Sequence, residues 1–170
     1  MESIQPILEA TGKAATAVRK LSLEDKKAIL IRLAALLNEK QEIIIQENKK
    51  DLDKMEDTDP KKDRLLLNES RINDLANSLH DILKLEDPAG KVLIDNHSAN
   101  GLHIQKITVP IGVVGVIYEA RPNVTIDVAA LCLYAGNAVV LRGGSDAEFT
   151  NQILVDVIHQ VLSEFNLDEN

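Results

Sequence analysis

Hydrophobic and polar positions divide the chain into a charged helical half and an apolar half rich in strands. In the first half, Leu, Ile and Ala recur at helical spacing among charged and amide side chains. Three helices are expected there, over residues 4–20, 22–50 and 69–84. Ser22 and Asp25 have the spacing of a helix N-terminal cap, and the acidic stretch 55–62 predicts a polar loop.

The pattern changes to a β-type pattern after Gly90. Two short apolar runs flank a polar turn and predict a hairpin, with strands at Val92–Ile94 and Leu102–Val109. Residues 111–118 are a Val and Ile run without charge, which predicts a parallel strand covered on both faces. A helix, a buried strand and a helix follow over residues 123–135, 138–141 and 147–165. This order indicates an α/β fold with one βαβα unit and a right-handed crossover.

The composition is that of one globular domain with an appendage, since 45% of the 170 residues are hydrophobic and 27% are charged. The net charge is −8 and the cations are interspersed among acids, which excludes the basic surface expected of a nucleic-acid binder. No apolar run reaches the ~18 residues that a membrane-spanning helix needs, and residues 1–20 lack a secretory signal pattern. We therefore expect a cytoplasmic protein without nucleic-acid or membrane partners.

Cysteine and histidine do not indicate a metal site. The single cysteine, Cys132, excludes an internal disulfide and a cysteine-based zinc site. Its apolar neighbours in a predicted helix favour a buried structural thiol over a nucleophile. The histidines show no ligand spacing and no accompanying carboxylate: His80, His97, His103 and His159. No bound metal is expected.

Charged side chains gather at the carboxyl ends of the two predicted parallel strands. Between residues 101 and 145 only five residues are charged, and three of them, Glu119, Arg121 and Arg142, follow these strands. Ligands bind at this edge in open α/β sheets. The functional site is therefore expected there.

The turn after the second parallel strand, Leu141-Arg-Gly-Gly-Ser145, has the outline of an anion site. Gly143 and Gly144 lead into a helix start, so that free backbone N–H groups and the Arg142 guanidinium meet at one edge. The guanidinium fork suits a ribose 2′-phosphate. Ser145 is compatible with two roles: a ligand-binding hydroxyl, or the N-cap of the last helix with Glu148 three positions later.

Asn123 and two glycines each allow a structural and a functional interpretation. Asn123 either caps the helix that follows or, like Arg121, faces an oxyanion or an acyl phosphate, and spacing alone favours the cap. Gly112 and Gly115 lie within the first parallel strand rather than at a strand-to-helix turn, so they indicate dinucleotide binding only weakly. Close packing of a neighbouring backbone is the favoured explanation of these glycines.

Three segments carry a family resemblance: Val109–Thr125, which contains Glu119-Ala-Arg-Pro-Asn123, then Ala135–Ser145, and Asp63–Leu67. Together they resemble the γ-glutamyl phosphate reductases, a branch of the aldehyde dehydrogenase superfamily, and the Glu-Ala-Arg-Pro-Asn element is specific to this branch. The similarity extends over essentially the whole chain. It implies an aldehyde-dehydrogenase-like fold with amino-terminal helices, a β-hairpin arm and the first βαβα unit of a Rossmann-like cofactor domain.

The resemblance further implies an NADPH-dependent oxidoreductase of proline biosynthesis that converts L-glutamyl 5-phosphate to L-glutamate 5-semialdehyde and phosphate. In that family a cysteine thiolate forms a thioester with the substrate, and NADPH reduces it. Asn123 resembles the oxyanion donor, Arg121 and Glu119 are assigned to substrate, and the hairpin resembles the arm by which these enzymes form homo-oligomers. The residues implied to bind NADP are Arg142, Gly143, Gly144 and Ser145.

The resemblance also divides the chain into three parts. Residues 1–90 are the helical part of the cofactor domain, 91–109 the hairpin arm for association, and 110–170 the first βαβα unit of the NADP-binding domain. The nucleophilic cysteine of the family belongs to a later catalytic domain that this sequence does not contain, and Cys132 cannot take its place. We therefore expect a fragment of a larger reductase, inactive alone. The alternative is a non-enzymatic, self-associating module that retains half of the dinucleotide-binding fold.

Overall fold

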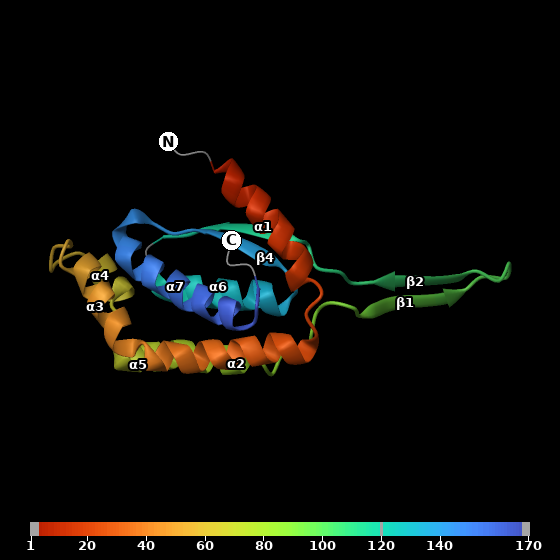
Figure 1. Cartoon of the computed structure of the whole chain (residues 1–170), viewed down its shortest axis with the longest axis horizontal. Helices are drawn as coiled ribbons and strands as arrows, with labels where there is room; N and C mark the ends of the chain where they lie inside the picture. Colours follow the sequence, from red (N-terminus) through yellow and green to blue (C-terminus); the bar gives the residue numbers. More distant parts are fainter. Residues whose placement is uncertain (1–3, 120, 168–170) are drawn as a thin grey trace.

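The computed structural model describes residues 4–119 and 121–167, and it has the expected division into amino-terminal helices, a hairpin and a βαβα unit (Figure 1). The helices before the hairpin are α1 (Gln5–Val18), α2 (Leu23–Glu39), α3 (Gln41–Leu52), α4 (Lys61–Leu65) and α5 (Glu69–Ile82). The remaining elements are β1 (Val92–His97), β2 (His103–Ile107), β3 (Val113–Ile117), α6 (Pro122–Tyr134), β4 (Ala138–Arg142), the 3₁₀ helix η1 (Ser145–Ala147) and α7 (Glu148–Glu164).

The helices of both halves share one hydrophobic core. Helices α2 and α5 lie side by side and pack on α6 and α7, which separate them from β4, while α1 contacts the strands (Figure 1). Each of the four central helices buries one apolar stripe, as helical spacing predicts. Fully buried members of the core include Leu30, Leu37, Ile72, Leu79, Ile126 and Leu154.

Two helix boundaries differ from the sequence prediction. The helix expected over residues 22–50 is two helices that meet at Lys40, because α3 turns away to pack against α7. No proline or glycine marks this break, and the helical spacing continues across it. The short helix α4 forms at the end of the stretch predicted as a loop, where Leu65 is fully buried. Tertiary packing therefore decides both boundaries.

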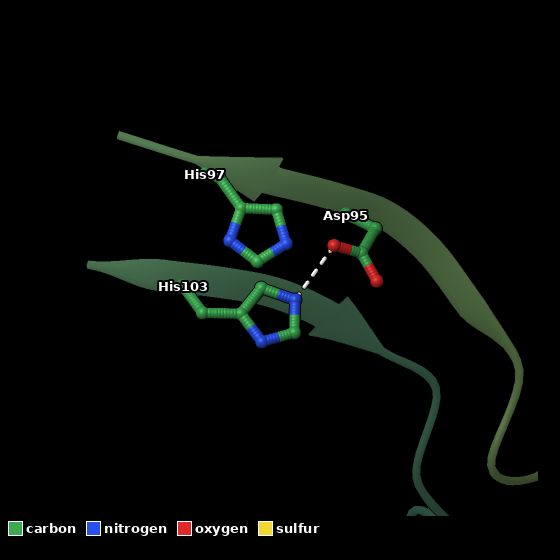
Figure 2. Close-up of side chains that lie close together, drawn as sticks. All are labelled: Asp95, His97 and His103. Carbon is green, nitrogen blue, oxygen red and sulfur yellow. Dashed lines mark hydrogen bonds and ion pairs between the residues drawn. The ribbon is translucent and has the colours of Figure 1, made fainter. Parts of the chain in front are cut away.

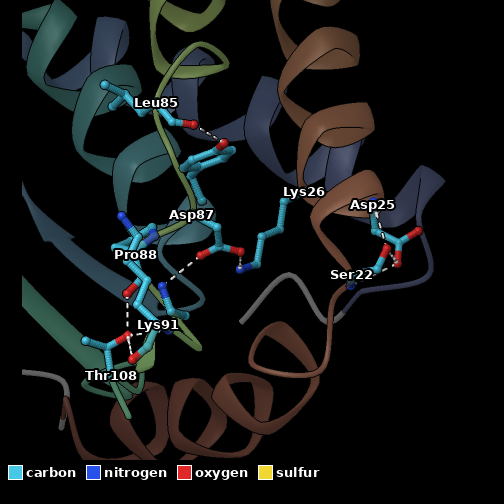
Figure 3. Close-up of polar contacts among 10 residues, drawn as sticks. Ser22, Asp25, Lys26, Leu85, Asp87, Pro88, Lys91 and Thr108 are labelled. Atoms are coloured by element: carbon cyan, nitrogen blue, oxygen red, sulfur yellow. Dashed lines mark hydrogen bonds and ion pairs between the residues drawn. The ribbon is translucent and has the colours of Figure 1, made fainter. Parts of the chain in front are cut away.

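Helix α2 begins where the cap was predicted and is tied to the segment that leads into the hairpin. The Ser22 hydroxyl accepts from Asp25 N–H at 3.0 Å, and the Asp25 carboxylate accepts from Ser22 N–H at 3.1 Å. One turn on, Lys26 Nζ lies 2.8 Å from Asp87 Oδ2, and the Lys26 side chain is only 5% exposed (Figure 3). Burial opposes ionisation of Asp87, but hydrogen bonds from Lys26 and Ala89 N–H outweigh it and hold the pKa of this carboxyl below its ordinary value.

The hairpin of β1 and β2 projects from the body and is fixed at its base by Thr108 (Figures 1 and 3). The Thr108 hydroxyl donates to the Pro88 carbonyl at 2.7 Å and accepts from Lys91 N–H at 2.9 Å. Two backbone hydrogen bonds complete the anchor: the Gly90 N–H donates to the Thr108 carbonyl, and the Thr108 N–H donates to the Lys91 carbonyl. Every residue of both strands is exposed. The hairpin is therefore an arm that the described residues support only at one end.

Strands β3 and β4 pair in parallel, as predicted, with Val113 opposite Ala138. The sequence predicted that the strand now labelled β3 is covered on both faces. Within the described residues this prediction is wrong, because Ile117 is 86% exposed and only alternate positions of β3 are half-buried. The cause is that this sheet has two strands, and α1 and α6 lie mainly over β4. Gly112 precedes β3 with φ +118°, and among the described residues no atom lies within 4 Å of a Cβ added at Gly112 or Gly115. The conformation at Gly112, rather than close packing, therefore requires a glycine.

Candidate functional site

Four of the residues singled out from the sequence line one small cavity at the carboxyl ends of β3 and β4. The cavity has a volume of about 150 Å³. Glu119 and Arg121 come from the segment after β3, and Gly144 and Ser145 from the turn after β4. The remaining lining residues are Lys61, Arg64 and Asp146. The prediction that polar groups from both strand ends meet at this edge is confirmed for Glu119, Arg121 and Ser145, but not for Arg142.

A larger cavity, of about 500 Å³, lies next to the small one and shares Arg64 and Arg121 with it. Asn123 and Asp127 from α6 line one side, and residues from α4 and α5 line the other. Asp127 accepts a hydrogen bond from Ser78 at 2.8 Å, which connects the two sides. The lining contains both cations and carboxylates, a composition that suits a ligand carrying charges of both signs.

The guanidinium groups that line these cavities differ in whether they already have partners. Arg71 donates to the carbonyls of Asp63 and Leu66 and to the Asp63 carboxylate, so it holds the α4–α5 turn. In the described ranges 4–119 and 121–167, neither the Arg64 nor the Arg121 side chain makes a hydrogen bond or ion pair. These two guanidinium groups are therefore the ones available to an anionic ligand.

Arg64 was not identified as a site residue from the sequence. It lies in the Asp63–Leu67 segment that carried part of the family resemblance, but on α4, far along the chain from the strand ends. Only the tertiary fold brings α4 to the sheet edge. No local spacing signal could have found it.

Asn123 is not the cap of α6, so the interpretation favoured by spacing is wrong. Arg121 occupies the N-cap position without a side-chain cap bond, and Pro122 fills the first helical position. The fixed φ and missing N–H of proline suit that position. Asn123 instead lines the larger cavity and donates weakly to Asp127 at 3.5 Å.

The helix start after β4 also differs from the prediction. Ser145 begins η1 rather than capping α7, and α7 starts three residues later with no cap bond of its own. The buried Asp51 carboxylate of α3 accepts from Thr150 N–H at 2.8 Å and from Phe149 N–H at 3.3 Å. The Phe149 and Thr150 N–H groups at the start of α7 are therefore bound by an internal carboxylate and are not available to an anionic ligand.

The two residues that follow β4 have different surroundings. Arg142 is exposed and lines neither cavity, and within the part of the chain that the structure describes its side chain makes no ion pair. Within the described residues, Arg142 is therefore not paired with an acid of α7. At Gly143 a Cβ would lie 2.2 Å from Asn151 Nδ2 and 3.2 Å from the Tyr118 ring, so any larger residue would require the Asn151 side chain to move.

Cys132 has the properties of a structural thiol. It lies mid-helix in α6 and is half-buried rather than fully buried. Burial raises the pKa of this thiol above its ordinary value, which lowers the fraction of reactive thiolate. It lines neither cavity.

Comparison with known proteins places this arrangement in a family. Residues 1–166 match the model of the aldehyde dehydrogenase family, and the chain therefore belongs to that family. The chain is 45% identical over 167 residues to the γ-glutamyl phosphate reductase of Chlorobaculum parvum, covering 98% of this chain and 40% of that protein. It is 47% identical over 161 residues to the γ-glutamyl phosphate reductase of Legionella pneumophila strain Lens, covering 95% of this chain and 39% of that protein.

Solved structures agree with the sequence comparison. The crystal structure of γ-glutamyl phosphate reductase from Thermotoga maritima matches with a TM-score of 0.90 and 33% identity, over 95% of this chain and 40% of that one. The crystal structure of γ-glutamyl phosphate reductase from Saccharomyces cerevisiae matches with a TM-score of 0.89 and 29% identity, over 98% of this chain and 43% of that one. The fold is thus that of the amino-terminal part of these reductases, and the chain spans about 40% of the length of the curated relatives it matches.

Proposed function

We propose that the chain is the amino-terminal part of an NADPH-dependent reductase that converts L-glutamyl 5-phosphate to L-glutamate 5-semialdehyde and phosphate in proline biosynthesis. The observation that carries the proposal is the pair of neighbouring cavities that share Arg64 and Arg121, in a chain 45% identical to a γ-glutamyl phosphate reductase. Among the residues that the structure describes, both guanidinium groups lack a hydrogen-bond or ion-pair partner. Within the described residues, no helix is long and apolar enough to cross a membrane. We further propose that the protein is cytoplasmic.

The charges around the larger cavity suit the proposed substrate. Glutamyl 5-phosphate carries an ammonium group, a carboxylate and an acyl phosphate. Arg64 and Arg121 supply donors for the two anionic groups, and Asp74 and Asp127 supply acceptors for the ammonium. The Asn123 amide lies in the same cavity, where a fixed donor would stabilise charge that develops on the acyl oxygen.

The nicotinamide cofactor of this family would be held at the end of β4. Arg142 is exposed there and makes no ion pair within ranges 4–119 and 121–167, so its guanidinium is available to the 2′-phosphate of NADPH. Ser145 and Gly144 would contribute beside it, and Gly143 would keep the turn tight against Asn151. When bound, the cofactor supplies hydride. The thiolate that forms the thioester belongs to a catalytic domain outside this chain.

The test is a hybrid enzyme in which this chain replaces the matching segment of the Chlorobaculum parvum reductase. We expect the hybrid to reduce NADP⁺ in the presence of glutamate 5-semialdehyde and phosphate, the reverse of the proposed reaction. We expect the isolated 170-residue chain to show no such activity, because Cys132 lies in neither cavity and its thiol is poorly ionised. NADPH formation by the isolated chain that Cys132→Ala abolishes would contradict this expectation.

We also propose that the hairpin arm mediates self-association. Ile94 and Ile104 are 46% and 53% exposed on the strands and lie diagonally across the register on one face. Exposed apolar side chains on a projecting hairpin favour a partner surface. We expect sedimentation of the chain to show an oligomer, and the double variant Ile94→Lys/Ile104→Lys to shift it toward monomer. A wild-type chain that remains monomeric at high concentration would exclude the arm as an association element.

A further inference from the structure

The register of the hairpin arm brings three metal-ligating side chains onto one face. His97 on β1 pairs directly with His103 on β2, and Asp95 pairs with Gln105 two residue pairs closer to the body. Side chains two residues apart on a strand share a face, so Asp95 lies beside His97. Figure 2 shows the carboxylate and both imidazole rings close together on the hairpin.

The distances within this cluster are short. His103 Nε2 lies 2.6 Å from Asp95 Oδ1, and the rings of His97 and His103 stack with centroids 4.2 Å apart. One ligand atom from each of the three residues lies within 4.8 Å of the others. Gln105 donates to the second Asp95 oxygen at 2.7 Å, which orients the carboxylate. Two nitrogen donors and one oxygen donor therefore already converge.

We propose that Asp95, His97 and His103 bind a divalent cation of the Zn²⁺ type within a single hairpin. Zn²⁺ takes imidazole nitrogen and carboxylate oxygen at about 2.0–2.2 Å, with water able to complete a tetrahedron. Donors at that radius are roughly 3.4 Å apart, so binding requires the rings to unstack and turn their nitrogens toward the carboxylate. The Asp95 and His103 side chains are 47% and 45% exposed, which leaves room for this rotation.

The prediction that no carboxylate accompanies the histidines is wrong for His97 and His103, because the Asp95 carboxylate lies beside both. The ligand set is formed across two strands, so it does not show as a motif along the chain. Asp95 and His97 were expected in the turn after the strand Val92–Ile94, but β1 extends to His97 and pairs both residues with β2. Pairing of the strands converts these positions into one cluster.

A cation at this position would stabilise the arm itself. Isolated two-stranded hairpins are marginally stable in water, and both strands of this one are exposed along their whole length. A ligand that binds the paired strands and not the separated ones favours the paired state. The apolar residues Ile94 and Ile104 lie on the other face, so cation binding leaves them free.

The test is a titration of the 170-residue chain with Zn²⁺ in competition with a chromophoric chelator. We expect one Zn²⁺ per chain. Residues that only hydrogen-bond to a metal ligand already contribute roughly 10- to 100-fold to metal affinity. Loss of a direct ligand in His97→Ala or His103→Ala should therefore weaken Zn²⁺ binding by at least about tenfold. The control is His80→Ala, which removes an exposed histidine of α5 and should change nothing.

Two further readouts keep the test decisive. Zn²⁺ should shift the imidazole NMR signals of His97 and His103 and leave those of His80 and His159 in place. The stoichiometry of one Zn²⁺ per chain should hold at every protein concentration, because the site lies within one chain. Unchanged Zn²⁺ affinity in both variants, absence of binding at about 0.1 mM Zn²⁺, or Zn²⁺ uptake only upon association of chains would overturn the proposal.

Discussion

Replacing Arg142 with alanine should weaken NADPH binding by the hybrid enzyme about ten- to a hundredfold and change NADH binding little. A hydrogen bond between two charged groups contributes roughly 1.5–3 kcal/mol, and each 1.4 kcal/mol corresponds to about one decade in Kd. Only NADPH carries the 2′-phosphate that this bond would reach. Nucleotide titrations followed by fluorescence would measure both dissociation constants on the same preparation.

The same titrations separate a cofactor contact from a structural role of Arg142. If Arg142 only supported the fold, Arg142→Ala would weaken the binding of both nucleotides equally and lower the free energy of unfolding. However, the Arg142 side chain makes no ion pair to any residue in 4–119 or 121–167. Arg19→Ala is the control, because Arg19 is an exposed arginine beyond the end of α1. Equal loss of NADPH and NADH affinity in Arg142→Ala would contradict the assignment of Arg142 to the 2′-phosphate.

Replacing Asp51 with alanine should lower the free energy of unfolding of the chain by about 3 kcal/mol. Its carboxylate is fully buried and accepts from Phe149 N–H, Thr150 N–H and the Thr150 hydroxyl. Removing it leaves the first N–H groups of α7 buried without partners, which is more costly than losing the bonds alone. Urea unfolding followed by circular dichroism would give the difference.

Asp53→Ala is the matched control for this variant. Asp53 is exposed at the end of the same helix, and surface substitutions usually change stability by less than about 0.5 kcal/mol. The Asn48 side-chain amide donates to the Thr150 hydroxyl, so Asn48→Ala should also lower the free energy of unfolding. A change below about 1 kcal/mol in Asp51→Ala would mean that solvent replaces the carboxylate at the start of α7.

The sequence was sufficient where local pattern determines structure. Apolar spacing located the strands and the helices other than α4, and the Ser22 cap formed as predicted. The break at Lys40 was not predictable, because it depends on how α3 meets α7 rather than on a local breaker. The same holds for the cap of α7, which Asp51 supplies from a helix almost a hundred residues earlier.

The sheet edge was predictable because parallel strands end together. Glu119, Arg121, Gly144 and Ser145 meet at one cavity for that reason. Arg64 joins them from α4, and no pattern along the chain links it to the strands. Likewise, the cluster of Asp95 and two histidines depends on strand register, which periodicity alone does not fix.

The most direct test of the proposed reductase is the phosphate dependence of NADPH formation by the hybrid enzyme. With glutamate 5-semialdehyde and NADP⁺ present, we expect NADPH to form only when phosphate is added, because phosphate must release the acyl group in the reverse reaction. Sedimentation and circular dichroism would establish that the hybrid is folded. A folded hybrid that forms no NADPH, or forms it equally well without phosphate, would contradict the assignment of this chain to a glutamyl phosphate reductase.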